Sequence, residues 1–285
     1  MKLGVSTYSL YKAIAAGELS PVQVVEEIAA MGGEHVEVVP IGFSLTERPE
    51  LIGQIRDKAQ ELGLEVSNYA IGANFYTETE EARQQEIERV KGEVEIARQL
   101  GVKLMRHDVA SAPDTSIQAF NARLDKLADA CRQVADYAAE AGITTSVENH
   151  GYFVQASDRV QALVAATDRA NFKTTLDIGN FMVVDEDSVA AVKKNIGIAS
   201  MVHIKDFYLR PGSRGLGEGW FKTASGNALR GAIAGHGDID MHEVLRTIKH
   251  AGYDGYLSIE FEGMEECKLG ARLALENVKR IWDEV

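Results

Sequence analysis

One unit recurs along this chain: an amphipathic helical stretch, a glycine where the helix ends, and a short run of β-forming residues. It is clearest in EEIAAMGGEHVEVV, KAQELGLEVSNYA, IARQLGVKLMRH, YAAEAGITTSVEN and TIKHAGYDGYLSIE. A glycine after the last helical turn readily takes the left-handed conformation that ends many helices. Helices and strands therefore alternate from one end of the chain to the other, which predicts an α/β protein with a parallel sheet.

Eight strands can be counted in this alternation. They are centred on Leu3–Ser6, Val36–Val39, Val66–Ala70, Lys103–His107, Thr144–Asn149, Thr174–Ile178, Met201–Lys205 and Tyr256–Glu260. Eight alternating units with short connections predict a (β/α)8 TIM barrel in which residues 1–285 form one domain. A doubly wound open sheet is the alternative.

Four of these strands carry a residue that can bind a metal near their C-terminal ends. They are Glu148 in TTSVENH, Asp177 in TTLDIGNF, His203 in MVHIKDF and Glu260 in YLSIEFEG. The first two intervals are 29 and 26 residues, about one strand–helix unit, so the first three ligands should lie on neighbouring strands. The last interval, 57 residues, has room for one unit and a long loop.

An acid in a buried parallel strand must be paired, hydrogen-bonded or metal-bound. Each carboxylate taken alone is explained as well by a salt bridge at the barrel mouth, but four such residues in register favour a metal site. Three carboxylates and an imidazole suit Mn²⁺, Co²⁺, Mg²⁺ or Zn²⁺. We therefore expect one divalent ion, with Mn²⁺ as the first expectation.

One connection is far longer than the others. The glycine-rich stretch at about 207–239, which includes RPGSRGLGEGWFKTASGN and GHGDID, follows the seventh predicted strand. At the catalytic end of a barrel such a loop can act as a lid, with Trp220 and Phe221 covering a bound ligand. The alternative is a flexible surface insertion.

The composition excludes several classes of partner. With 43 acidic and 30 basic residues the formal net charge is −13, which argues against the basic face that binds nucleic acid. No apolar run is long enough to cross a membrane, and the N-terminus MKLGVSTYSL lacks the pattern of a signal peptide. The only two cysteines, Cys131 and Cys267, fall in separate predicted helices and imply no disulfide framework. We therefore expect a cytoplasmic protein with neither a nucleic-acid nor a membrane partner.

The motifs VENHG, LDIGN, VHIKD and GHGDID followed by GYDGYLSIEFEG resemble those of the sugar-phosphate isomerase/epimerase superfamily with a xylose-isomerase-like barrel. That superfamily includes ketose 3-epimerases, hydroxypyruvate isomerase, inosose isomerases and dehydratases, and endonuclease IV. The resemblance implies that Glu148, Asp177, His203 and Glu260 bind one divalent metal and that the two glutamates exchange protons with a carbohydrate substrate. It also leaves open a homo-oligomer.

The chain departs from two branches of this superfamily. Asn180 stands where endonuclease IV and the ketose 3-epimerases carry a histidine, and Val154 stands where the epimerases carry an additional glutamate. An AP endonuclease is therefore disfavoured, as is close identity with a tagatose- or psicose-type epimerase.

Further polar residues near the strand ends are candidate substrate contacts, each with a structural role in the barrel mouth as the alternative. They are His107, His150, Asn180, Lys205, Arg106 and Trp220, together with Tyr8, Glu37 and Asn68 on the first three strands. His150 and Lys205 each follow a predicted ligand by two residues and should share its strand face. Of the neighbours Arg106 and His107, one should reach the mouth.

The leading functional hypothesis is a metal-dependent isomerase or epimerase that acts on a small ketose or keto-sugar by proton transfer through an enediolate. The second is a dehydratase or lyase of a keto-sugar or inosose, in which an acid such as His107, His150 or Lys205 helps a hydroxyl to leave. A non-catalytic sugar-binding barrel is the third. Whether the substrate is phosphorylated depends on whether Arg210, Arg214, Lys222 or Arg230 of the long loop reaches it.

Overall fold

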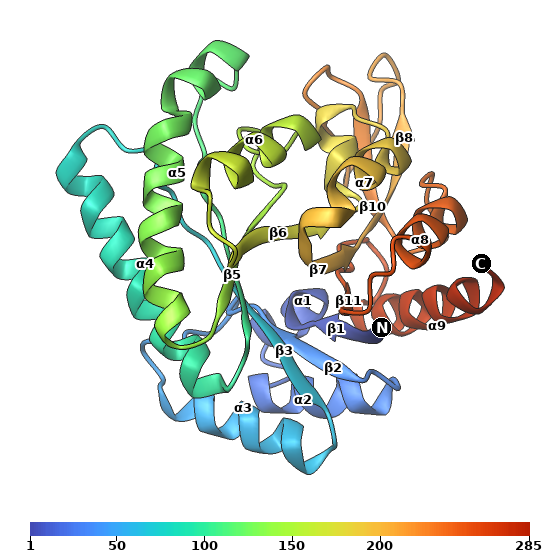
Figure 1. Ribbon diagram of the computed structural model, residues 1–285. Helices are drawn as coiled ribbons and strands as arrows, with labels where there is room; N and C mark the ends of the chain where they lie inside the picture. The colour runs from blue at the N-terminus through green and yellow to red at the C-terminus, as the bar shows by residue number, and fades with distance from the viewer.

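Eight parallel strands close into a barrel in the computed structural model, which describes residues 1–285 (Figure 1). The strands are β1 Lys2–Ser6, β2 His35–Val38, β3 Glu65–Ile71, β4 Leu104–His107, β5 Thr144–Glu148, β6 Phe172–Asp177, β7 Ala199–Ile204 and β11 Tyr256–Ile259. Each pairs with the next in this order, and β11 returns to β1. The predicted (β/α)8 barrel is confirmed, and the open sheet is excluded.

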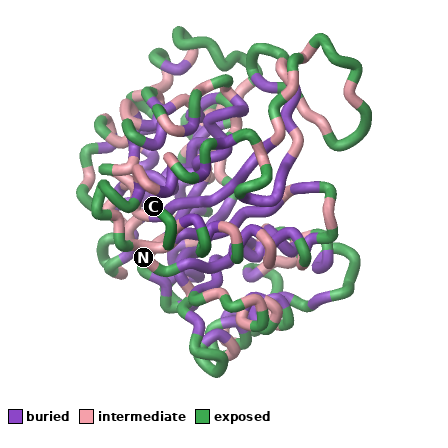
Figure 2. The backbone as a smooth tube through the Cα atoms, turned by 90° about the vertical axis from the view of Figure 1, so that its right-hand side faces the viewer, coloured by how far each residue is buried: buried purple, intermediate pink, exposed green.

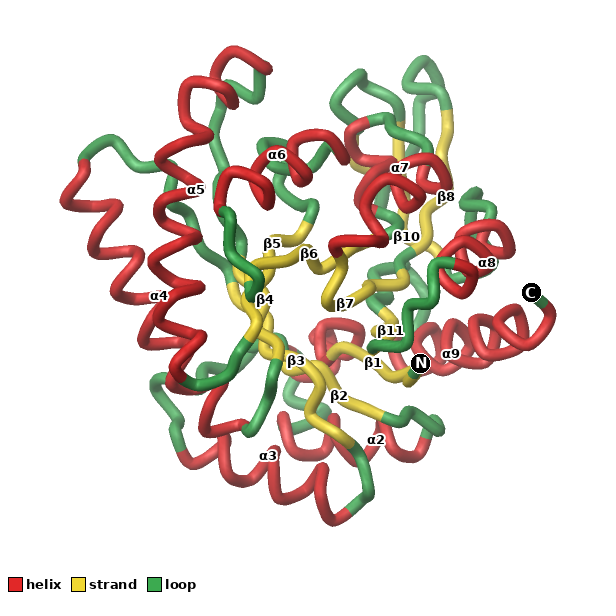
Figure 3. The backbone as a smooth tube through the Cα atoms, viewed as in Figure 1, coloured by secondary structure: helices red, strands yellow, loops and turns green.

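Helices surround the barrel on all sides, as the red coils around the yellow strands show (Figure 3). They are α1 Tyr11–Ala15, α2 Pro21–Ala30, α3 Glu50–Glu61, α4 Glu80–Leu100, α5 Ile117–Glu140, α6 Ser157–Thr167, α7 Ser188–Asn195, α8 Met241–His250 and α9 Cys267–Glu284, with short 3-10 turns η1 Thr7–Leu10, η2 Asn180–Val184 and η3 Ile196–Ile198. No helix combines the length and the apolar character needed to cross a bilayer.

Each helix buries one apolar face against the strands. In α5 the buried positions include Phe120, Leu127 and Val134, which recur at helical spacing. The buried strands run through the centre of the molecule and the exposed residues lie on its outside (Figure 2). The start of α2 is fixed by a capping box between Ser20 and Gln23, as its sequence indicates.

Alternation along each strand separates the polar interior of the barrel mouth from the apolar layer under the helices. Arg106 pairs in register with Ser146, and His107 pairs with Val147. Since successive side chains point to opposite faces, Arg106 shares the inner face with Glu148, while His107 points outward. Register therefore decides which of these neighbours reaches the mouth.

The long segment after β7 is more regular than its glycine content suggests. It forms a three-stranded antiparallel sheet from β8 Asp206–Arg210, β10 Ala228–Ala232 and β9 Phe221–Lys222. Asp206 fixes the turn that follows β10, because its carboxylate accepts hydrogen bonds from the backbone N–H groups of Gly235 and Gly237, both at 2.9 Å. A side chain at position 237 would collide with Asp206, so only glycine fits there.

Candidate active site and metal centre

The four residues predicted to bind a metal converge at one end of the barrel. Glu148, Asp177, His203 and Glu260 are all buried, and one ligand atom from each lies within 4.8 Å of the other three. Glu148 ends β5, Asp177 ends β6, and Glu260 directly follows β11. The C-terminal ends of the strands thus bring together residues that are up to 112 positions apart in the sequence.

Strand register accounts for this convergence. Asp177 lies directly opposite His203 in the pairing of β6 with β7, and Glu148 lies opposite Thr175, which shares a strand face with Asp177. Asn149 links the end of β5 to the end of β6. Its side-chain NH₂ group donates to the carbonyl oxygen of Asp177, and its Oδ1 accepts a hydrogen bond from the N–H of Asp177, both at 2.8 Å.

Two buried ligand atoms are left without a hydrogen bond, and this indicates that the residues fit a cation. They are Oδ2 of Asp177 and Nδ1 of His203. Lys205 Nζ approaches the former at 3.2 Å but without hydrogen-bond geometry. An unpartnered buried polar atom costs about 1–3 kcal/mol, which metal coordination would remove. The donor set of three carboxylates and one imidazole suits a divalent ion.

Glu37 orients the histidine of this cluster from below. Its Oε1 lies 2.8 Å from Nε2 of His203 and also accepts a hydrogen bond from the Asn68 amide at 2.7 Å. Burial alone would raise the pKa of Glu37, but His203 and Asn68 lower it to about 2. The carboxylate therefore holds a proton on Nε2 of His203, so that Nδ1 is the nitrogen that faces the other ligands. We had expected Glu37 and Asn68 at the mouth; the structure buries both beneath it.

Arg106 sets the charge of Glu148. Its guanidinium lies 2.6 Å from Glu148 Oε2 and 2.9 Å from Asp108 Oδ1. Burial favours the neutral form of Glu148, yet Arg106 and His203 hold its pKa well below the usual value. Asn180 donates to the other oxygen of Glu148 at 2.8 Å. Glu148 is thus an ionised carboxylate with a fixed orientation.

Lys205 occupies a comparable position beside Glu260. Its Nζ lies 3.0 Å from Glu260 Oε2 and 3.4 Å from Glu262 Oε2, and Tyr8 donates to Glu262 at 3.1 Å. Burial would lower the pKa of Lys205, but Asp177, Glu262 and Glu260 raise it well above the usual value. For Glu260 burial dominates and raises the pKa, although His203 and Lys205 oppose that effect.

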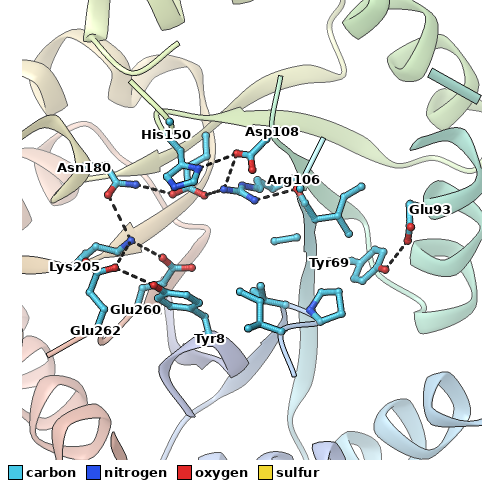
Figure 4. Close-up of a pocket in the computed structure, with 18 of the residues that line it drawn as sticks. Tyr8, Tyr69, Glu93, Arg106, Asp108, His150, Asn180, Lys205, Glu260 and Glu262 are labelled. Atoms are coloured by element: carbon cyan, nitrogen blue, oxygen red, sulfur yellow. Dashed lines mark hydrogen bonds and ion pairs between the residues drawn. The ribbon is translucent and has the colours of Figure 1, made fainter. Parts of the chain in front are cut away.

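A cavity of about 640 Å³ opens over this cluster (Figure 4). Glu148 and Glu260 line it, whereas the fully buried Asp177 and His203 lie beneath its floor. The figure shows Lys205, Glu260 and Glu262 on one side of the opening and Tyr69, hydrogen-bonded to Glu93, across from them. The two glutamates are thus the members of the cluster that a substrate can reach.

The predicted substrate contacts divide into two groups. Arg106, His150, Asn180 and Lys205 line the cavity. His150 is half-exposed, and its Nδ1 lies 3.2 Å from Asp108 Oδ1. Burial would lower the pKa of His150, but Asp108 raises it.

His107 and Trp220 do not line the cavity, and for these two the expectation of a substrate contact is corrected. His107 is fully buried on the outer face of β4, where its ring packs edge-on against Phe75 at 5.6 Å. Trp220 packs against the guanidinium of Arg230, 5.1 Å from the ring centre. Its neighbour Phe221 reaches the cavity instead and packs on Phe207.

Comparison with known proteins identifies the family. The model of the xylose isomerase-like TIM barrel family matches residues 25–281. The chain belongs to this family. Among curated relatives, the inosose dehydratase of Geobacillus thermodenitrificans is 27% identical over 139 residues, which is 48% of this chain and 47% of that protein. The chain thus spans about half the length of the curated relatives it matches.

Several solved structures share the fold over almost the whole chain. An L-ribulose 3-epimerase superposes with a TM-score of 0.76 at 17% identity, covering 99% of this chain and 95% of its own. A 3-keto-D-glucoside 4-epimerase from E. coli gives a TM-score of 0.73 at 16% identity, covering 98% and 99%. At these identities the likeness establishes the barrel and not the reaction.

Two residues of the site have no counterpart in the sequence-based prediction. Asp108 contacts both Arg106 and His150, and Glu262 contacts both Lys205 and Tyr8. Glu262 follows Glu260 by two residues, the same spacing that identified His150 and Lys205, so this signal was present in the sequence. Asp108 lies just beyond β4, where no strand periodicity applies.

Proposed function

We propose that this chain is a divalent-metal-dependent isomerase or epimerase that moves a proton beside the carbonyl of a small ketose or keto-sugar. One observation carries the proposal: Glu148 and Glu260 line the same cavity and belong to one four-residue cluster that suits a divalent ion, at the ends of the outer two of four neighbouring strands. A bound divalent cation would polarise a substrate carbonyl and acidify the neighbouring C–H bond.

The chain's own residues would then move the proton. Glu148, kept ionised by Arg106, takes the proton from the carbon next to the carbonyl and leaves an enediolate. Glu260, whose pKa is raised by burial, delivers a proton to the other face or to the next carbon. Asn180 and Lys205 hold the two carboxylates in place, at 2.8 Å and 3.0 Å respectively.

The alternative is a dehydratase, and the curated relatives named inosose dehydratase favour it. In this reaction the same proton abstraction is followed by loss of a β-hydroxyl, which needs a proton donor at the cavity wall. Lys205 and His150 both line the cavity and are the candidates. His107, which we had also considered, is excluded from this role because its ring faces away from the cavity.

Solvent exchange tests the proposal and separates the two reactions. The Mn²⁺-loaded protein is incubated in heavy water with a panel of ketoses, inososes and 3-keto-glycosides. Isomerisation or epimerisation introduces deuterium with no other change in mass, whereas dehydration removes water and creates an ultraviolet-absorbing enone.

Glu148→Gln and Glu260→Gln identify the proton carriers. Glutamine keeps an oxygen for the metal but lacks a basic carboxylate, so at least one variant should lose exchange by about 100-fold or more. Metal content is measured in each variant, because metal loss would imitate loss of the base. Near-normal turnover in both metal-loaded variants would show that neither glutamate is the base.

A further inference from the structure

The lining of the cavity carries a large excess of negative charge. Five carboxylates line it: Glu93, Asp108, Glu148, Glu260 and Glu262. Three positively charged side chains stand against them: Arg89, Arg106 and Lys205. Beneath the floor, Glu37 and Asp177 add two negative charges and the protonated His203 adds one positive charge, so that the excess is three. A divalent ion that displaces the His203 proton would leave an excess of two.

The cations of the lining are already paired. Arg106 contacts Glu148 and Asp108 at 2.6 and 2.9 Å, and Lys205 contacts Glu260 and Glu262 at 3.0 and 3.4 Å. A phosphate or carboxylate on the substrate would have to displace one of these buried pairs, and the released carboxylate would then be left without its partner.

Arg89 is also paired, with Glu86 at 2.8 Å and Glu93 at 3.4 Å, although its side chain is 43% exposed.

The long segment after β7 contributes no cation to the lining. Arg210, Arg214, Lys222 and Arg230 are all absent from the cavity lining. Arg210 pairs with Asp238 at 2.7 Å, and Arg230 stacks on Tyr208 and Trp220 at 5.0 and 5.1 Å. None of these four cations is therefore placed at the cavity wall.

A second part of the cavity is apolar. The chain between β2 and α3 contributes Val39, Pro40, Ile41, Phe43 and Leu45 to the lining. Within this group, Ile41 is 41% exposed. A volume of about 640 Å³ places the cavity among those that hold drug-sized molecules, so it has room beyond a single sugar ring.

We propose that the substrate is an uncharged keto-glycoside, for which simple glycosides serve as unreactive analogues. Its hydroxylated ring lies over Glu148 and Glu260, where carboxylates accept hydrogen bonds from hydroxyl groups, and its apolar second group lies against residues 39–45. The acidic excess selects against phosphorylated and carboxylated sugars. This inference rests on the proposed function, because it names the substrate class of the same site.

Binding calorimetry on the Mn²⁺-loaded protein tests this inference without any chemistry. The probes are the methyl and phenyl β-glycosides of glucose, galactose and mannose, the 6-phosphates of the phenyl hexosides, and phenyl glucuronide. For the sugar that binds best, the phenyl glycoside should bind about tenfold more tightly than the methyl glycoside. Its charged counterpart should bind about tenfold more weakly or not at all.

Matched variants connect these preferences to the residues. Phe43→Ala should remove most of the advantage of the phenyl group. The double variant Asp108→Asn with Glu262→Gln should reduce discrimination against the phosphate, whereas Asp283→Asn, at an exposed position of α9 outside the cavity, should leave it unchanged.

The inference is overturned if a charged glycoside binds as tightly as its neutral counterpart, if methyl and phenyl glycosides bind equally, or if no glycoside binds. Because these probes have no ketone, their binding is independent of proton transfer. Failure of the proposed function would appear instead as absent solvent exchange on the ketose panel.

Discussion

Glu37 does not line the cavity, yet its carboxylate determines which nitrogen of His203 faces the metal ligands. Carboxylates that orient a ligating histidine typically contribute 10- to 100-fold to metal affinity. We therefore expect Glu37→Ala to weaken Mn²⁺ binding by about 10- to 100-fold, as measured by titration calorimetry. Glu37→Gln keeps an oxygen that can accept the Nε2 proton and should recover part of the loss. Wild-type affinity in the alanine variant would mean that His203 is oriented by its packing alone.

His107 illustrates a different role for a histidine at a strand end. Burial lowers its pKa to about 4, and its Nδ1 lies 2.9 Å from the carbonyl oxygen of Asp108. Since the folded-state pKa lies below the usual unfolded value of about 6.5, its neutral form stabilises the fold above pH 6.5. That contribution is lost as the pH falls towards 4.

We expect His107→Asn to remove this pH dependence, because asparagine can still donate to the Asp108 carbonyl but does not titrate. Between pH 7 and pH 5 the wild type should lose about 2 kcal/mol of unfolding free energy from this group alone. The measurement compares urea unfolding of the two proteins in the presence of a chelator. Parallel curves across this pH range would show that the pKa of His107 is the same in the folded and the unfolded protein.

At the scale of elements, the segment after β7 presents two neighbouring aromatic rings to different surroundings. Phe221 of β9 lines the cavity, whereas the preceding Trp220 packs on Arg230. Phe221→Ala should raise KM or slow turnover with metal content unchanged, and Trp220→Ala should have a smaller effect. Steady-state kinetics on the substrate found by the exchange panel tests this. A larger effect of Trp220→Ala would indicate that the segment closes differently over the substrate.

Local sequence signals predicted most of the elements. The glycines that end helices and the β-rich runs that follow them depend on neighbouring residues alone, and all eight barrel strands were found within a few residues of their bounds. β8, β9 and β10 were missed because they pair only with one another within the insertion, and β9 has only two residues. Short strands of this kind carry no periodicity of their own.

In the candidate site, too, some residues are predictable from local sequence signals and others depend on tertiary contacts. Glu148, Asp177, His203 and Glu260 could be proposed because residue type and unit spacing bring them to one end of a barrel. Whether Arg106 or His107 faces inward depends on the register between β4 and β5, which is a tertiary property. The role of Glu37 likewise depends on its contact with His203, 166 residues away.

At the scale of the whole molecule, the acidic cluster couples the stability of the fold to proton binding and to metal binding. Burial would lower the pKa of His203, but Glu260, Glu37 and Glu148 raise it well above the usual value. The protonated imidazole therefore stabilises the metal-free protein below pH 6.5, and this stabilisation is lost as the pH rises through the folded-state pKa. A metal ion that binds Nδ1 must displace that proton.

We accordingly expect Mn²⁺ to raise thermal stability more at pH 8 than at pH 6 for the same free ion concentration. A ligand present at 100 times its dissociation constant stabilises the folded state by about 2.7 kcal/mol, and proton competition at pH 6 reduces that gain by weakening the binding. Asp177→Ala should abolish the Mn²⁺-dependent gain at both pH values, because it removes one of the four converging ligands. Asp283→Asn makes the same change in net charge at an exposed position and should keep the gain. Calorimetric melting of the three proteins with and without Mn²⁺ provides the comparison. An equal gain in all three proteins would place the bound metal elsewhere, and an equal gain at both pH values would show that no proton leaves His203 when the metal binds.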